Sequence, residues 1–354
     1  MAHPYAPMGG SYDDRVVGMI VDEFLKAGWI VGTFNFRGAH GSKGRTSWSG
    51  RPELDDYTSF AGFFMHYMSY LRPHPNPDTC FTPEQSPIKP RDVQAETSKS
   101  GRNEEIPIVI LGGYSYGSLI LKNLPPVLTL IQPFSAPVTG SASDEIIMRA
   151  HKLADQSNLA WINLARNRER EARPKAKGHE PNSSFTMGGE ETKPEKRRTS
   201  RDIRRSMEGG LGIEIGSRLR SLSHRGRKDS SPAVSLERKK IAPLTLPEVQ
   251  YLLVSPLSPP ISTLAAPALG HKFWSRGKEP FHNAIGKHAT FAIYGGHDIF
   301  TSAKRTRGWS EQMRATPGSQ FSSLEIAEAG HFWVGNGVEG KLRAALREWQ
   351  HVPY

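Results

Sequence analysis

The sequence predicts an α/β fold with a mostly parallel sheet and helices on both faces. Several continuous apolar runs have the length of buried strands, and between them lie stretches whose apolar residues recur with helical spacing. Strands that alternate with helices form parallel sheets that are covered on both faces. The predicted strands are IPIVILGG (106–113), VQYLLVSPL (249–257) and ATFAIYGG (289–296), with further runs at 29–36 and 322–330.

The helices are predicted from apolar spacing and from residues that start or stop helices. The acidic pair Asp13–Asp14 precedes the first helix, and Pro52 opens the second. The pair Pro125–Pro126 stops the helix that begins at Tyr116. The predicted helices cover residues 16–25, 52–67, 116–124, 143–165, 302–313 and 338–350.

The net charge of +11 on this 354-residue chain is concentrated in one segment. Residues 161–240 hold 21 Lys and Arg residues and 11 Asp and Glu residues. The rest of the chain holds 25 basic and 24 acidic residues, so it is nearly neutral. The segment has too few large apolar residues to offset its ordering entropy, so we expect disorder over 166–245. No aromatic residues interleave its basic run to stack on bases, and the remainder is nearly neutral. Nucleic acid is therefore not an expected partner.

Composition shifts along the chain suggest a domain organisation. We expect an N-terminal part of the core over 1–124, with a Pro-rich loop insert at 72–105. The other parts are a helical cap at 125–165, the disordered basic insert at 166–245 and the C-terminal part of the core at 246–354.

The cysteine count and the hydropathy of the chain indicate its cellular compartment and the cofactors to expect. Cys80 is the single cysteine, which excludes an internal disulfide and favours a reducing compartment. No apolar run approaches the ~18 residues that span a bilayer, and no secretory signal is visible. We expect a cytoplasmic protein, with a nuclear location left open by the basic clusters. No cofactor is expected, and Cys80 with His74 falls short of a metal-ligand set.

Basic residues stand just before Ser200 and Ser206 in the basic insert. Basophilic kinases recognise such sites, so the sequence suggests a kinase as a partner there. A solvated insert without a regulatory role is the alternative.

The motif GYSYG (113–117) lies where a buried strand meets a helix. A serine in this place sits on a sharp turn that exposes its hydroxyl, and the backbone N–H of Tyr116 can face a developing oxyanion. The spacing alone would occur by chance in roughly 0.3 of such chains. A phosphate-binding turn is the alternative, but neither a Walker lysine nor dinucleotide-type glycine spacing is present.

A serine nucleophile needs a base and a carboxylate that orients the base. On this kind of fold the expected chain order is Ser, then Asp or Glu, then His. Asp298 follows the strand at 289–296, and His331 follows the strand at 322–330. His297 is a weaker rival base, because it is adjacent to Asp298 in the sequence.

The chain resembles the α/β-hydrolase superfamily, in particular its esterase-like group related to dienelactone hydrolases. The matching pieces are HPYAPMGGSYDD (3–14), FNFRGAHGSKG (34–44), PELDD (52–56), GGYSYGS (112–118), YGGHDIF (294–300) and AGHFWV (329–334). The resemblance implies that Ser115 is the nucleophile, His331 the base and Asp298 its orienting carboxylate. It also implies a second oxyanion donor near Tyr5, and a structural turn at Arg37–Gly38.

The resemblance also predicts that N-terminal strands are missing. In this fold the loop that begins at His3 follows a strand between those at 29–36 and 106–113. Without that strand its neighbours would lie ~9–10 Å apart, with unpaired backbone groups that cost ~1–3 kcal/mol each. We therefore expect a shortened form or an incomplete gene model.

The expected function is hydrolysis of a small-molecule carboxylic ester or thioester through an acyl-enzyme. An amide is equally compatible with these residues. The alternative is a non-catalytic scaffold of the same fold, whose phosphorylatable basic insert recruits partners. Neither the acyl nor the alcohol group is predicted by the sequence.

Overall fold

The computed structural model describes residues 1–72, 107–172, 246–270 and 284–350. The described elements belong to one compact unit, Met1–Glu171 with Ala242–Tyr354, apart from the last residue of α5. The strands are β1 (Ile108–Tyr114), β2 (Glu248–Val254), β3 (Thr290–Gly295) and β4 (Phe321–Ile326). The helices are η1 (Ala6–Met8), α1 (Arg15–Lys26), α2 (Arg51–Tyr70), α3 (Tyr116–Lys122), α4 (Val127–Ser135), α5 (Ala142–Ala172), α6 (Ile261–Ala265), α7 (Pro267–Gly270), α8 (Ala284–Lys287), α9 (Ala303–Ala315) and α10 (Val338–Gln350).

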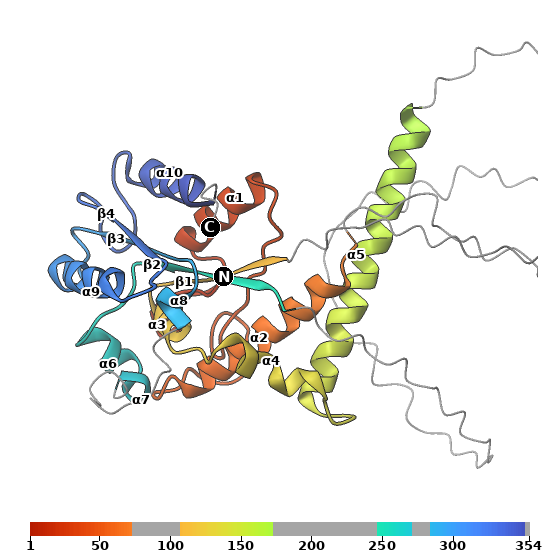
Figure 1. The fold of residues 1–354 in the computed structure, drawn as a ribbon, viewed down its shortest axis with the longest axis horizontal. Helices are drawn as coiled ribbons and strands as arrows, with labels where there is room; N and C mark the ends of the chain where they lie inside the picture. Colours follow the sequence, from red (N-terminus) through yellow and green to blue (C-terminus); the bar gives the residue numbers. More distant parts are fainter. Residues whose placement is uncertain (73–106, 173–245, 271–283, 351–354) are drawn as a thin grey trace, which may run out of the picture. The chain divides into compact units, whose positions relative to one another are not determined.

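The four strands form one sheet in the order β1-β2-β3-β4 (Figure 1). All three strand pairs are parallel, and the register places Gly112 opposite Leu252 and Gly295 opposite Ile326. The carboxyl ends of all four strands therefore lie at one edge of the sheet, where the loops that follow β1, β3 and β4 meet.

Helices cover both faces of this sheet (Figure 1). On one face, α1 and α10 bury apolar side chains against Tyr114, Leu252 and Ile293. On the other face, α2, α3 and α4 form a second core with Leu111, Leu253 and further apolar residues of the strands. The prediction of an α/β fold with a parallel sheet between two helical layers is confirmed.

The two helices of the first face begin and pair through charged side chains. Asp14 is the N-cap of α1, and its carboxylate accepts hydrogen bonds from the amides of Val16 and Val17. The carboxylate of Glu23 in α1 is buried and accepts hydrogen bonds from Arg343 and Arg347 of α10, each at 2.7 Å. Two cations thus offset the burial of one anion and fix α10 against α1.

On the second face, α4 crosses α2 at a glycine. A Cβ at Gly62 would overlap the ring of Phe134, so this close approach requires a residue without a side chain. The N-terminal part of α5 lies against the end of α2, where the hydroxyls of Tyr67 and Ser157 are 3.0 Å apart. The predicted helical segment 125–165 therefore corresponds to α4 and most of α5, and its action as a cap stays a prediction.

The structure differs from the sequence-based expectation in one strand that does not form and in the bounds of several elements. Residues 29–36 form no strand, because along most of their length no neighbouring strand lies beside them to complete a ladder. β2 ends at Val254 rather than at residue 257. The next residue, Ser255, has a φ of 46° and turns the chain out of the strand. α5 continues to Ala172, so the start of the predicted disordered segment is helical.

Two further predictions fall on parts of the chain that are not described. The loop insert (72–105) lies outside the described residues except for Arg72, and the basic insert beyond 172 lies outside them as well. Within the described residues, no helix is both long enough and apolar enough to cross a membrane.

Candidate active site

Ser115 occupies the one-residue turn between β1 and α3. Its φ of 55° and ψ of −114° are strained for a residue with a side chain. The turn is held from behind, because the Ser115 amide donates a 2.9 Å hydrogen bond to the carbonyl of Val254 at the end of β2. This geometry turns the hydroxyl of Ser115 out of the sheet at its carboxyl edge.

The two glycines of GYSYG allow three backbone segments to meet at this turn. A Cβ at Gly113 would overlap the backbone of Gly117, so β1 and α3 touch directly. A Cβ at Gly117 would lie 2.6 Å from the carbonyl oxygen of Ala2 and 2.9 Å from that of His3. Both positions therefore require a residue without a side chain, and the second glycine also admits the N-terminal loop.

Asp298 and His331 come from adjacent loops at the same edge. The amide of Gly296 donates to Ile326 and the amide of His297 donates to Ala329, both at 2.9 Å, which ties the β3 loop to the β4 loop. The side chain of His297, the rival base, is exposed.

The three predicted side chains form one hydrogen-bonded chain. His331 Nε2 lies 2.8 Å from Ser115 Oγ, and His331 Nδ1 lies 2.7 Å from Asp298 Oδ2. Only 2% of each side chain in the His–Asp pair is exposed. An ionised carboxylate only accepts hydrogen bonds, so Nδ1 carries a proton and Nε2 is free to accept the proton of the serine hydroxyl.

The second carboxylate oxygen of Asp298 is fixed by the backbone. Oδ1 accepts hydrogen bonds from the amides of Phe300 at 2.8 Å and Thr301 at 2.9 Å. Both oxygens are therefore committed, and the carboxylate cannot rotate without losing two hydrogen bonds. The N-cap residue of α9 is Ser302, so Asp298 does not serve as the cap of that helix.

The two backbone amides that the sequence analysis suggested as oxyanion donors belong to Tyr116 and Tyr5. Tyr116 begins α3, and the Tyr5 ring packs against its ring at a centroid distance of 5.0 Å. Within the described residues, neither the Tyr116 amide nor the Tyr5 amide donates a hydrogen bond. The Tyr116 amide, at the first residue of α3, is therefore unengaged beside Ser115, and the role of the Tyr5 amide stays a prediction.

His3 holds the loop that carries Tyr5. The Phe36 amide donates to its Nε2 at 2.9 Å, and its Nδ1 donates to the Pro4 carbonyl at 2.6 Å. A ring that accepts at one nitrogen and donates at the other is neutral. Burial lowers the pKa of His3 below its usual value, although the Pro4 carbonyl acts in the opposite direction, and this favours the neutral form.

The main-chain carbonyl of His331 is held by residues that the sequence analysis did not single out. The Tyr114 hydroxyl donates to the His331 carbonyl at 3.0 Å. Ser255 Oγ lies 3.4 Å from the same oxygen and accepts a 3.0 Å hydrogen bond from the indole of Trp333. Burial raises the pKa of Tyr114 above the range in which it would ionise, so it stays a donor. The available signal in the sequence was that Tyr114 directly precedes Ser115 and that Trp333 lies two residues after His331.

The Arg37–Gly38 turn is structural. Arg37 donates two side-chain hydrogen bonds to Asp56 of α2, at 3.0 and 2.6 Å. Gly38 has a φ of 78°, and a Cβ there would lie 2.6 Å from the Thr46 amide nitrogen. Among the described residues, no cluster of three His, Cys, Asp or Glu side chains is arranged to hold a metal ion.

The parallel sheet, the two helical layers and the strained strand–turn–helix at Ser115 together decide the fold class. The fold is α/β-hydrolase-like. Neither a search of protein-family models nor a search of curated proteins found a match to the chain.

Two solved structures resemble the α/β-hydrolase-like chain. One is an alpha-beta serine hydrolase homologue from Coxiella burnetii, and the other is XC6422 from Xanthomonas campestris, described as a member of the a/b serine hydrolases without a lid. Both are 12% identical to this chain with a TM-score of 0.40, and the alignments cover 98% and 100% of this chain and 81% of each of theirs.

Proposed function

We propose that the protein is a serine hydrolase that cleaves a carboxylic ester through an acyl-enzyme. The observation that carries the proposal is the unbroken hydrogen-bonded chain from Ser115 through His331 to Asp298, with Ser115 on a strained turn next to the unengaged amide of Tyr116. Each of these features is needed for nucleophilic catalysis by serine, and the chain combines them at one edge of the sheet.

In the proposed reaction, Ser115 Oγ attacks the carbonyl carbon of the ester while His331 Nε2 takes the hydroxyl proton. The oxygen of the tetrahedral intermediate receives hydrogen bonds from the amides of Tyr116 and Tyr5. His331 then gives its proton to the leaving alcohol, which departs and leaves the acyl group on Ser115. Water, activated by the same imidazole, hydrolyses the acyl-enzyme and restores the free serine. Asp298 orients the ring and stabilises its positive charge.

Exposed apolar side chains next to the site support an ester with an apolar acyl or alcohol group. Ile299 follows Asp298 and is 74% exposed, and Phe332 follows His331 and is 49% exposed. The Phe332 ring also lies against Phe300, whose own ring packs on His331 at 4.7 Å between centroids. The same mechanism would cleave a thioester, so the assays below compare an alcohol with a thiol as the leaving group.

Labelling with a fluorophosphonate probe tests the proposal, because this reagent modifies an activated serine. We expect the wild-type chain and Ser135→Ala, a control at an exposed serine of α4, to be labelled equally. Ser115→Ala is expected to remain unlabelled while keeping its thermal unfolding midpoint. Parallel assays with p-nitrophenyl esters and the matching thioesters then define the leaving group. A folded wild-type chain that takes up no label contradicts the proposal and favours the non-catalytic scaffold.

A further inference from the structure

Three consecutive main-chain carbonyls at the candidate base accept hydrogen bonds from side chains. The Tyr114 hydroxyl donates to the carbonyl of His331 at 3.0 Å. One nitrogen of the Arg15 guanidinium, Nη2, donates to the carbonyls of Phe332 at 2.8 Å and Trp333 at 3.0 Å. The segment that carries the imidazole is therefore held by side chains at every carbonyl from residue 331 to residue 333, and Arg15 serves two of them.

These contacts act on a tight turn that contains a strained residue. The Trp333 amide donates to the Gly330 carbonyl at 3.2 Å, which makes His331 and Phe332 the two central residues of the turn. Trp333 has a φ of 54°, in the left-handed region that a residue with a bulky side chain rarely adopts. Such a conformation persists only where the surrounding structure imposes it. The carbonyls that Arg15 binds belong to the peptide groups on either side of Trp333, so the guanidinium holds this residue from both sides.

Arg15 is itself anchored to two helices. It is the first residue of α1 and directly follows the N-cap Asp14, so the start of the helix fixes its backbone. Its other terminal nitrogen, Nη1, donates to the carboxylate of Glu339 in α10 at 3.2 Å. The Arg15 side chain is 51% exposed, and an ion pair of this kind contributes little in water. The hydrogen bonds to the two carbonyls are therefore the contacts that matter for the turn.

The position of the turn sets the distance over which the proposed proton transfer takes place. His331 Nε2 lies 2.8 Å from Ser115 Oγ. Asp298 holds the other ring nitrogen and so fixes the rotation of the ring, whereas Arg15 and Tyr114 hold the backbone that carries it. A displacement of about 1 Å in a catalytic group costs on the order of 100-fold in rate.

We propose that Arg15 is a positioning residue, which holds the backbone of Phe332 and Trp333 so that the imidazole of His331 stays in line with Ser115. The inference rests on the proposed hydrolase function. Arg15 acts through the main chain of the turn, so loss of its two hydrogen bonds slows the attack by serine and leaves substrate binding unchanged.

Arg15→Met and Glu339→Gln separate this role from general support of the fold. Arg15→Met keeps the length of the side chain and removes its donors, whereas Glu339→Gln breaks the ion pair to α10 and leaves the contacts with the turn. We expect Arg15→Met to lower kcat for p-nitrophenyl esters by about 10- to 100-fold, with KM changed by less than about twofold. Glu339→Gln is expected to keep kcat within about twofold of wild type. Thermal unfolding shows whether each variant is folded.

Amide hydrogen exchange at Trp333 gives a measurement that does not depend on activity. This amide donates to Gly330, so its exchange reports the opening of the turn. We expect exchange at least about tenfold faster in Arg15→Met than in wild type, and unchanged exchange in Glu339→Gln. Arg15→Lys keeps the charge without the planar fork and is expected to lower kcat by about three- to tenfold. This variant decides the question if Arg15→Met does not fold.

The outcomes distinguish failure of this inference from failure of the proposed function. The positioning role would be overturned if the wild-type chain is labelled by the fluorophosphonate and hydrolyses esters while a folded Arg15→Met has the same kcat. Equal losses of kcat in Arg15→Met and Glu339→Gln would also overturn it, because the ion pair would then be the source of the effect. A folded wild-type chain that takes up no label would contradict the hydrolase and the positioning role together.

Discussion

Replacing Asp298 by Asn tests whether the His331 tautomer controls the reaction, with almost no change in shape. Oδ1 of Asp298 accepts two backbone hydrogen bonds, so the Asn side chain must keep its carbonyl oxygen there. Its amide nitrogen then takes the place of Oδ2, 2.7 Å from His331 Nδ1. An NH2 group can only donate, which forces the ring proton onto Nε2.

A ring that carries its proton on Nε2 cannot accept the proton of Ser115. The expected effect of Asp298→Asn is therefore a fall in kcat of about 10⁴-fold, equivalent to about 5.5 kcal/mol, with KM nearly unchanged. The assay is hydrolysis of p-nitrophenyl esters across a pH series, with thermal unfolding of both proteins to show that the fold is retained. A loss smaller than about tenfold in a folded variant would refute the reasoning, because the ring would then be able to act in either tautomer.

Three further predictions concern the supports of the site. Gly117→Ala places a Cβ 2.6 Å from the Ala2 carbonyl, so we expect at least about tenfold lower esterase activity and a lower urea midpoint, both measured against wild type. Tyr114→Phe removes a donor to a buried carbonyl and should lower the free energy of unfolding by about 1–3 kcal/mol in urea titrations; an unchanged midpoint would contradict this. Burial lowers the pKa of His3 below its usual value of 6.5, so the unfolded chain binds more protons than the folded chain as pH falls below that value. The free energy of unfolding should therefore fall as pH drops below the usual histidine pKa, and a flat urea midpoint from about pH 8 to about pH 5 would exclude the effect.

Much of the fold was predictable because its signals are local. Apolar runs of strand length gave β1, β2 and β3, and the acidic residue Asp14 caps α1 as expected. The GYSYG motif predicted a sharp turn between a strand and a helix, and its two glycines occupy positions where a Cβ would overlap neighbouring backbone. The chain order of Ser115, Asp298 and His331 selected the three residues that the structure brings together, although their catalytic roles remain a proposal.

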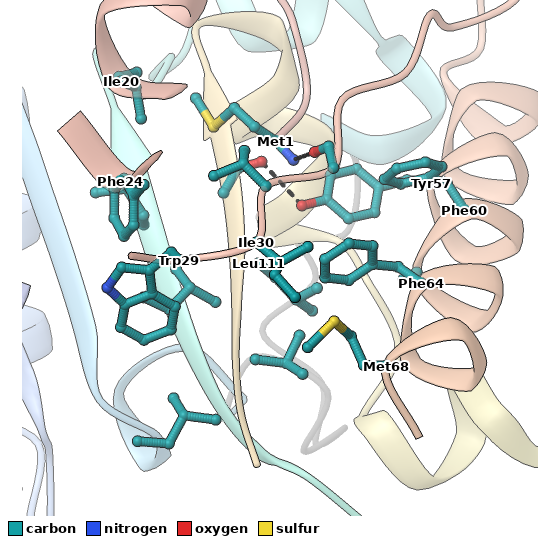
Figure 2. A pocket seen from close by; sticks show the side chains of 18 residues that line it. Met1, Ile20, Phe24, Trp29, Ile30, Tyr57, Phe60, Phe64, Met68 and Leu111 are labelled. Carbon is teal, nitrogen blue, oxygen red and sulfur yellow. Dashed lines mark hydrogen bonds between the residues drawn. The ribbon is translucent and has the colours of Figure 1, made fainter. Parts of the chain in front are cut away.

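Other features depend on partners that are distant in the sequence. The sequence indicated a strand at 29–36, but a strand exists only when a neighbour completes its ladder, and among the described residues the backbone partner of this segment is the Met1 amine, which donates to Gly32 (Figure 2). The contacts of Tyr114, Ser255 and Trp333 with one another and with the His331 carbonyl join three separate segments, and the short sequence distance of Tyr114 from Ser115 and of Trp333 from His331 is their one local signal.

Residue types and their spacing were enough to establish an alternation of strands and helices, and to point to a serine on a sharp turn, because these properties follow from interactions between near neighbours. The distances among the site residues and the packing of Tyr5 on Tyr116 were decided only when the chain folded. They arise from backbone hydrogen bonds and side-chain packing between segments far apart in the sequence, whose spatial proximity no local pattern encodes.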